Sequence, residues 1–199
     1  RLETDDAADY TFRIATYTTM FDSTQINRST NLKIACRYLD NIELSPGDEF
    51  SYNMALGPRT YDKGYRSAPI VGGITGYSIG GGICQVTTTL FNAVLLSNLE
   101  ITLRYNHGIV ISYAPVGRDA TVYWGTYDFR FINSYDFPIM IDAVYNEIAE
   151  MVTVSIYAQE EFTLPDISIE VHRGEVTGIW YTNRYADGVV NYTCFSIYK

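Results

Sequence analysis

The chain has 199 residues, of which 47% are hydrophobic, and it carries a formal net charge of −9 at pH 7. Such a length suits one domain with a sizeable core, or one domain with a small appendage. The charge excludes nucleic acid as a favourable partner and disfavours an anionic membrane surface, because both need clustered Lys and Arg. The 18 tyrosines favour a protein rich in strands, since aromatic side chains suit half-buried sheet faces.

The first 40 residues predict a loose acidic leader, a strand and a helix. Residues 1–10 are polar and acidic, and residues 11–22 are rich in Thr, Tyr and Phe, which favours a strand. Residues 27–40 show helical spacing of apolar side chains. The side chains on the apolar face of this expected helix are Leu32, Ala35, Cys36 and Leu39.

A glycine-rich segment precedes the most apolar part of the chain. Residues 68–82 contain six glycines and no charged side chain, and the stretch at residues 84–99 is apolar on nearly every side of a helix. A helix of that kind is buried in a globular protein. We therefore predict that residues 84–99 form the central helix of the domain.

The rest of the chain has the pattern of strands. Short strands are expected within residues 101–113 and 119–133, and residues 165–199 add further strand-like pieces. Three segments alternate apolar and polar residues and predict an antiparallel meander. These are DFRFIN (128–133), PIMIDAVYN (138–146) and MVTVSIYA (151–158).

The fold class expected from these elements is α+β. Two main helices should pack on an antiparallel or mixed sheet, followed by a β-rich C-terminal section. We expect three parts: a leader at 1–10, a main domain at 11–158 that holds the elements above, and a C-terminal extension at 159–199 packed on that domain.

The most informative chemical feature is a cysteine that follows Gly80–Gly82 at the start of the central helix. The N–H groups and dipole of a first helical turn stabilise an anion and so lower the pKa of a thiol. Glycines let the backbone approach a substrate and direct N–H groups at an oxyanion. Cys84 is therefore a candidate nucleophile, with Gly81, Gly82 and Cys84 itself as candidate backbone donors. The same pattern also suits a tight turn with a small buried cysteine.

A nucleophilic thiolate commonly has a histidine partner, and the chain has two histidines. His107 lies in a turn soon after the central helix, where the returning chain can meet Cys84, so we favour it over His172. Asp119 is the candidate that orients the imidazole, with Asn106 and a backbone carbonyl as rivals.

The other cysteines have a structural explanation. Cys36 falls on a helix face typical of a core, and a Cys36–Cys194 disulfide remains open because sequence does not set distances. No C-x-x-C pair or histidine cluster suggests zinc, and we expect no metal and no cofactor.

Four arginines lie near these residues in the sequence: Arg59, Arg66, Arg104 and Arg118. Arginine forks bind carboxylates, although for each of these side chains taken singly a structural ion pair is the commoner role.

Over about residues 12–158, the chain resembles the VanW family in several motifs and in their order. These motifs are NRSTNLKIA from Asn27, SPGDEFSYN from Ser45, GPRTYDKGYRSAP from Gly57, GGGICQVTTTLFNA from Gly80, the spacing Arg104 to His107, YAPVGRDATV from Tyr113, and DFRFIN from Asp128. Residues 160–199 match less distinctly.

The resemblance implies a bacterial cell-envelope protein on the cell-wall side of the membrane, which it would contact only through a tether outside this chain. Some VanW-domain proteins are regarded as L,D-transpeptidases distinct from the YkuD-like enzymes, and the family nucleophile and histidine correspond to Cys84 and His107. The implied partners are peptidoglycan stem peptides, as donor and acceptor. We expect substrate contacts from Arg59, Tyr65, Gln85, Arg104, Tyr113 and Arg118.

Two other functions fit the same residues. One is a non-catalytic module that binds peptidoglycan or glycopeptides. The other is a cysteine carboxypeptidase or amidase, in which water replaces the acceptor amine.

Overall fold

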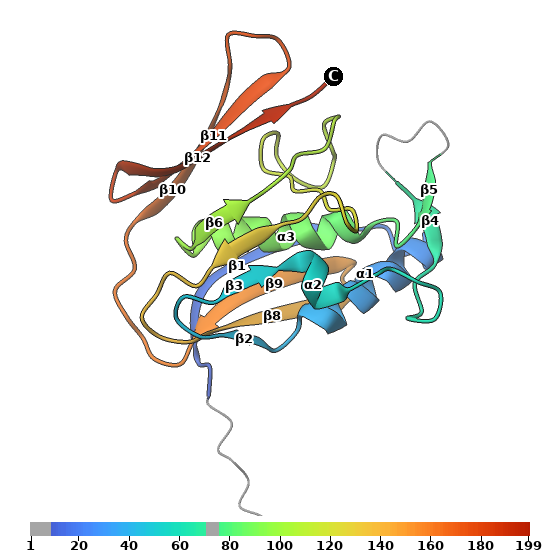
Figure 1. The fold of residues 1–199 in the computed structure, drawn as a ribbon, viewed down its shortest axis with the longest axis horizontal. Coiled ribbons are helices and arrows are strands. Elements are labelled where there is room, and N and C mark those ends of the chain that lie inside the picture. Colours follow the sequence, from blue (N-terminus) through green and yellow to red (C-terminus); the bar gives the residue numbers. More distant parts are fainter. Residues whose placement is uncertain (1–8, 71–75) are drawn as a thin grey trace, which may run out of the picture.

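A computed structural model describes residues 9–70 and 76–199 of the protein (Figure 1). These residues form three helices and many antiparallel strands, so the α+β class is confirmed in that coarse form. The finer prediction needs correction, because a third, short helix is present and the strands divide among four sheets. Most of the expected leader, residues 1–8, lies outside the described part of the chain.

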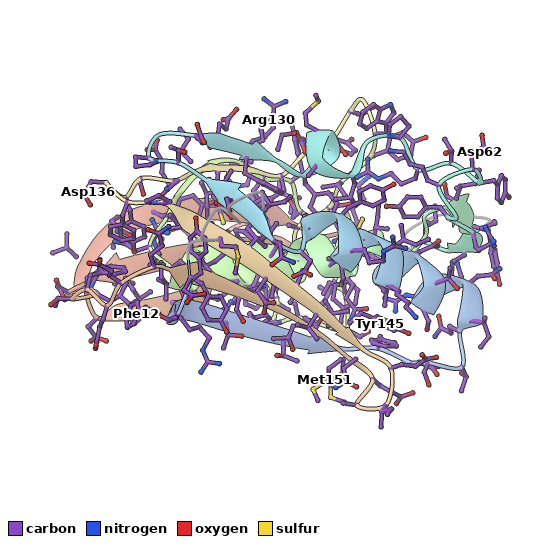
Figure 2. All side chains as sticks on the ribbon, turned by 90° about the horizontal axis from the view of Figure 1, so that it is seen from below. Phe12, Asp62, Arg130, Asp136, Tyr145 and Met151 are labelled. Carbon is purple, nitrogen blue, oxygen red and sulfur yellow. The ribbon has the colours of Figure 1, made fainter. Side chains whose placement is uncertain are left out.

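The main sheet has four strands in the order β1–β9–β8–β2, and all neighbours are antiparallel. Its strands are β1 (Phe12–Met20), β2 (Ile42–Leu44), β8 (Ile139–Asn146) and β9 (Met151–Ala158). Alternating burial along β8 confirms that one face of that strand packs on the core. Figure 2 shows Phe12 and Met151 at opposite ends of this sheet.

The helices are α1 (Ile26–Leu39), α2 (Tyr52–Leu56) and α3 (Ile83–Leu96), and the two long ones confirm the helices expected at 27–40 and 84–99. α1 packs against β8, and α3 packs against β1 and β9. The expected apolar face of α1, including Cys36, is buried. Among the described residues all three cysteines are free thiols, so Cys36 and Cys194 do not pair.

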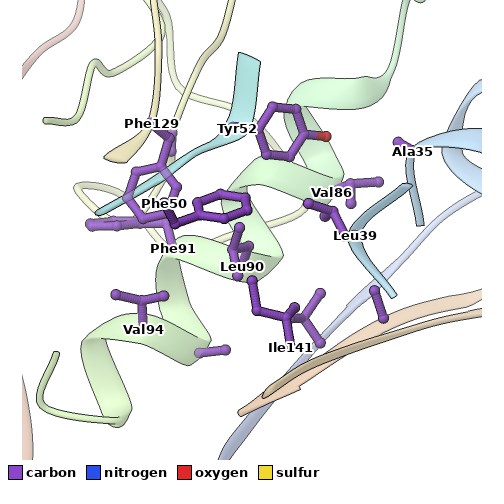
Figure 3. Packing of buried hydrophobic residues seen from close by; sticks show 14 of the residues in the cluster. Ala35, Leu39, Phe50, Tyr52, Val86, Leu90, Phe91, Val94, Phe129 and Ile141 are labelled. Atoms are coloured by element: carbon purple, nitrogen blue, oxygen red, sulfur yellow. The ribbon is translucent and has the colours of Figure 1, made fainter. Parts of the chain in front are cut away.

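A second sheet covers the side of α3 that faces away from the main sheet. It has the order β3–β7–β6, with β3 (Glu49–Ser51), β6 (Glu100–Leu103) and β7 (Arg130–Ile132). Phe91 of α3 meets Phe129 edge to face at 5.7 Å between ring centroids, while Ile141 of β8 approaches from the other side (Figure 3). The predicted burial of this helix on nearly all sides is confirmed, because it lies between two sheets.

The expected three-strand meander is wrong in its first member. β8 and β9 pair as predicted, but β7 pairs with β3 and β6 instead. The buried Asn133 ends β7 by donating to Leu44 O and Phe137 O, each at 2.9 Å, and the chain turns away before β8. Alternation shows which face of a strand is buried, but it does not identify the neighbouring strand.

Each of the ranges 101–113 and 119–133 contains a short strand, as expected, although most of their residues lie outside it. β6 ends at Leu103 and β7 begins at Arg130, and the segment between them contains only an isolated bridge between Tyr123 and Tyr127. Side-chain hydrogen bonds hold this irregular segment in place of a strand ladder, and it carries the predicted histidine and aspartate.

Two further sheets complete the described structure. β4 (Ser67–Pro69) and β5 (Tyr77–Ile79) form a hairpin before the glycine turn. The C-terminal sheet has the order β10–β11–β12, with β10 (Ile167–Arg173), β11 (Ile179–Ala186) and β12 (Val189–Ile197), and Figure 1 shows it on the same side of the molecule as β6. β12 reaches the irregular segment through hydrogen bonds from Arg104 and Asn106. The division into domains at residue 158 stays a prediction.

Candidate active site

Cys84 is the second residue of α3, directly after the turn formed by Gly80–Gly82. Gly82 caps the helix with a φ of 103°, and a Cβ there would stand 2.7 Å from Arg28 Cγ. This left-handed conformation favours glycine. The turn places the half-buried Cys84 in the wall of a cavity of about 500 Å³.

Two backbone donors at this turn have no acceptor. Within residues 9–70 and 76–199, the N–H groups of Gly82 and Cys84 make no hydrogen bond, and both residues line the cavity. The N–H of Gly81 donates to Ser78 O at 3.0 Å, so it does not serve as the third donor that the sequence suggested. An oxyanion formed beside Cys84 would find its donors at Gly82 and Cys84.

His107 and Asp119 form a buried pair beside the same cavity. Asp119 is fully buried, and its Oδ2 contacts His107 twice. It accepts a hydrogen bond of 2.6 Å from the backbone N–H of His107, and it lies 2.6 Å from ring Nδ1 of the same residue. Engagement of Nδ1 by the carboxylate leaves Nε2 as the ring nitrogen available to Cys84, and hydrogen bonding between the two side chains contributes to their pKa shifts. Asp119 therefore occupies the place of the orienting group, while the rival Asn106 donates to backbone carbonyls.

The charges of Cys84 and His107 support each other. Burial raises the pKa of the Cys84 thiol, but hydrogen bonding and charge from His107, with help from Thr121 and Val122, outweigh burial and lower it. Sγ lies 3.5 Å from Thr121 Oγ1 and 3.6 Å from Val122 O. Burial lowers the pKa of His107, but Asp119 and the Cys84 thiolate outweigh that effect and raise it to about 9. Both shifts favour the pair of thiolate and imidazolium over the neutral pair.

The second carboxylate oxygen of Asp119 is held from behind. Oδ1 accepts from Arg104 at 3.1 Å and from the phenol of Tyr198. Burial raises the pKa of Asp119, but His107, Arg104 and Tyr198 outweigh it and lower the pKa. Asp119 thus stays ionised and stabilises the proton on His107. Arg104, expected to bind substrate, lies outside the cavity and acts on Asp119 instead.

A polar stripe on α3 fixes the segment that carries Asp119. Thr88 exchanges two hydrogen bonds of 3.0 Å with the backbone of Ala120, and Asn92 donates to Arg118 O and accepts from Arg118 Nε. Cys84, Thr88 and Asn92 follow one another at intervals of four, so they share one face of the helix. Our sequence reasoning missed this stripe, although polar residues at that spacing on an apolar helix are a readable signal.

The remaining predicted substrate contacts divide into two groups. Arg59 and Tyr113 line the cavity. Arg118 instead packs over the Tyr17 ring at 5.3 Å, and Tyr65 is fully buried in the core. Gln85 is buried as well and holds Arg28, which itself lines the cavity.

The aromatic part of the cavity wall was not expected from the sequence. It includes Tyr123, Trp124 and Tyr127 from the irregular segment between β6 and β7. Asn53 braces this part by donating to Tyr127 O at 2.8 Å. No local periodicity marks these residues, because they reach the cavity only through the path of the folded chain.

Replacing Tyr198 with phenylalanine is expected to lower the free energy of unfolding by about 1.5–3 kcal/mol, the range for a hydrogen bond to a charged group. The phenol donates to the buried Asp119 carboxylate and accepts from Gly117 N–H at 2.9 Å. Ionised Asp119 stabilises the fold above its unfolded pKa, and this contribution is lost as pH falls through the depressed folded pKa. Since the phenol helps to lower that pKa, its removal should move acid unfolding to higher pH.

Denaturant unfolding at neutral pH and acid titration followed by circular dichroism would test this. Tyr185→Phe is the matched control, because that hydroxyl meets Glu170 at the surface and should matter little. Equal effects of both substitutions would contradict the role assigned to Tyr198.

The site combines a cysteine at the start of a helix with a histidine that contacts a buried aspartate, beside a cavity in an α+β fold. This arrangement is a cysteine–histidine–aspartate group. A sequence profile for the family described as VanW like protein matches residues 27–157. The chain belongs to the VanW family.

Two relatives give the scale of the similarity. The chain is 48% identical over 134 residues to the protein YoaR of Bacillus subtilis (strain 168). The aligned region covers 67% of this chain and 44% of YoaR. It is 32% identical over 119 residues to the vancomycin B-type resistance protein VanW of Enterococcus faecalis (strain ATCC 700802 / V583). That aligned region covers 56% of this chain and 43% of the enterococcal protein. The chain thus spans less than half the length of either relative. No solved structure matches it.

The described residues lack two features that would indicate other kinds of site. None of their helices combines the length and apolar character needed to cross a membrane. They also contain no group of three or more His, Cys, Asp or Glu side chains arranged to hold a metal ion.

Proposed function

We propose that this chain is the catalytic domain of a peptidoglycan L,D-transpeptidase that acts through a thioester on Cys84, on the cell-wall side of the bacterial membrane. The observation that carries the proposal is the pairing of Cys84 with His107, which Asp119 orients, next to two N–H groups that find no acceptor in the described part of the chain. Membership of the VanW family supports a cell-wall-associated protein.

Acylation would begin with attack of the Cys84 thiolate on the carbonyl between the third residue of a donor tetrapeptide and its terminal D-Ala. The N–H groups of Gly82 and Cys84 would stabilise the oxyanion. Collapse of the tetrahedral intermediate breaks the amide bond, and Nε2 of His107 gives its proton to the leaving amine. The products are a thioester on Cys84 and free D-Ala.

In the second step the acyl group is transferred to the acceptor, and His107 would act as the base instead of the acid. A side-chain amine of the third residue of a second stem attacks the thioester, and neutral His107 takes the proton from that amine. The thiolate leaves, the imidazolium is restored, and the two third residues are joined by a new amide. Water in place of the amine gives a tripeptide, which is an L,D-carboxypeptidase reaction by the same two steps.

The test is to incubate the purified protein with tetrapeptide muropeptides and follow the products by mass spectrometry. We expect dimers that have lost one D-Ala, and an acyl adduct on the intact protein. Cys84→Ala should abolish both while leaving the circular dichroism spectrum unchanged. Cys194→Ala is the matched control, because this free thiol lies in the C-terminal sheet away from the cavity and should be dispensable.

Other outcomes would decide among the alternatives. Tripeptides without dimers would indicate a carboxypeptidase on the same site. Dimers formed by Cys84→Ala would exclude the thioester mechanism. Binding of muropeptides without any product would indicate a non-catalytic module.

A further inference from the structure

The cavity beside Cys84 has an electrostatic character opposite to that of the whole chain. The protein carries a net charge of −9, yet the described residues lining this cavity include Arg28, Arg59 and His107 and no Asp or Glu. A cavity walled by cations focuses its field on anionic groups. The charge of the cavity therefore selects a ligand that carries a carboxylate or a similar anion.

Of the two arginines, Arg28 already has an internal partner. Its Nη2 donates to the amide oxygen of Gln85, and Gln85 is in turn held by Thr19 and Met20. Arg28 is thus fixed within the protein and contributes mainly its charge to the cavity.

Arg59 is held in a different way. Its Nη1 donates to Gly57 O at 3.0 Å, and the guanidinium lies over the rings of Tyr52 and Trp124, at 5.7 and 5.9 Å from their centroids. Its side-chain stem lies along the glycine turn, since a Cβ on Gly80 would stand 2.9 Å from Arg59 Cγ. These contacts fix the guanidinium beside the turn that carries the oxyanion donors.

The remaining edge of the Arg59 guanidinium has no partner. Nε and Nη2 are shielded from water and make no hydrogen bond to any described residue. Leaving charged donors buried and unpaired is costly. These two atoms are the parallel donors with which arginine binds a carboxylate through two hydrogen bonds. The fold thus maintains a desolvated fork whose natural complement is a carboxylate.

We propose that Arg59 is a specificity-determining residue that binds the free terminal carboxylate of the donor peptide, one residue beyond the amide that Cys84 attacks. The assignment of this carboxylate to a donor stem rests on the proposed function. The Nε–Nη2 edge of Arg59 receives the two carboxylate oxygens, and peptides whose terminus is blocked are poor donors.

Entry of the carboxylate requires a side chain next to the fork to move, because the fork is shielded from water, and we infer that this side chain is Trp124, which lies against the guanidinium. Trp124 is 43% exposed and lies in the irregular segment, so its outward movement displaces little packing. Binding should therefore change the fluorescence of Trp124. The second tryptophan, Trp180, lies in β11 outside the cavity and can be replaced by phenylalanine to remove its signal.

The experiment uses the full chain with Cys84→Ala, which prevents turnover, and Trp180→Phe. Its probes are a stem tetrapeptide ending in D-Ala and the same peptide as its C-terminal amide, titrated by tryptophan fluorescence and calorimetry. We expect the amide to bind on the order of 10- to 100-fold more weakly than the free acid. Arg59→Gln should weaken binding of the free acid by a similar factor and leave binding of the amide unchanged. Arg59→Lys, which keeps the charge but not the fork, should fall between the two.

This cycle separates the carboxylate site from the overall fold and from catalysis. Equal affinities for the two peptides, equal weakening of both by Arg59→Gln, or no detectable binding of the free acid would each overturn the proposal. Coupling between Arg59 and the carboxylate in a protein that forms no dimers would retain the carboxylate site and reject the transpeptidase. Dimer formation without such coupling would retain the transpeptidase and reject the carboxylate site.

Discussion

Replacing His107 with alanine is expected to slow acylation of Cys84 by about 10²- to 10⁴-fold, the range for loss of a positioned acid or base. Two effects act in the same direction. The imidazolium no longer stabilises the thiolate, so burial is left to raise the pKa of Cys84. The leaving amine also loses its proton donor. His172→Ala is the matched control, because this second histidine is exposed on β10 and stacks on Tyr181.

The rate of Cys84 acylation should depend on pH through the protonation of both Cys84 and His107. Acylation needs the thiolate and the protonated imidazole together, so the rate should fall on the acid side as Cys84 is protonated. It should fall again near pH 9, because the pKa of His107 is raised to about 9. In His107→Ala, alkylation of Cys84 should require higher pH than in the wild type.

Iodoacetamide alkylation followed by peptide mass spectrometry would measure this for each cysteine. Cys36, whose pKa burial raises to about 12, is an internal reference that should stay unreactive below that pH. An unchanged pH midpoint for Cys84 in His107→Ala would show that the imidazole does not stabilise the thiolate.

Replacing Gly81 with alanine is expected to lower the free energy of unfolding by about 3 kcal/mol, the upper end of the usual cost of overpacking. A Cβ at this position would stand 2.2 Å from Ala68 O and 2.8 Å from Pro69 O, both backbone atoms of β4. Gly81 cannot shift freely, since its carbonyl accepts from Asn31 at 2.9 Å and its N–H donates to Ser78. The glycine turn should therefore open, and Cys84 should leave its position.

Urea unfolding would measure the loss of stability. Gly108→Ala is the matched control, because a Cβ there would meet nothing within 4 Å and the residue has no positive φ. A Gly81→Ala protein as stable as Gly108→Ala would contradict the close approach of the turn to β4.

Local patterns were sufficient for the long elements. The helical spacing of Leu32 to Leu39 predicted α1, and the apolar stretch after Cys84 predicted α3 within a few residues at each end. These patterns are local because a helix repeats its contacts every three or four residues. β7 shows the limit, since the alternation of Phe129, just before this strand, and Phe131 within it identified a buried face but not the neighbouring strands β3 and β6.

The candidate site shows the same boundary. Motifs at Cys84, His107 and Asp119 directed attention to the residues that the structure brings together, although their catalytic roles stay a prediction. The arginines were harder to assign, because Arg104 and Arg118 turn to internal partners while Arg59 lines the cavity. An arginine has the same chemistry in either place, and only its neighbours decide its role.

The sequence by itself determined the family, the α+β class, and the cysteine placed after a glycine turn at the start of a buried helix. Only the tertiary structure decided that Asp119 meets His107, that Tyr198, just after the C-terminal sheet, holds Asp119, and that the fork of Arg59 finds no partner among the described residues. The first set depends on contacts between residues close in the chain. The second depends on contacts between distant segments, whose hydrogen-bond partners and solvent exposure are set only when the sheets and α3 pack together.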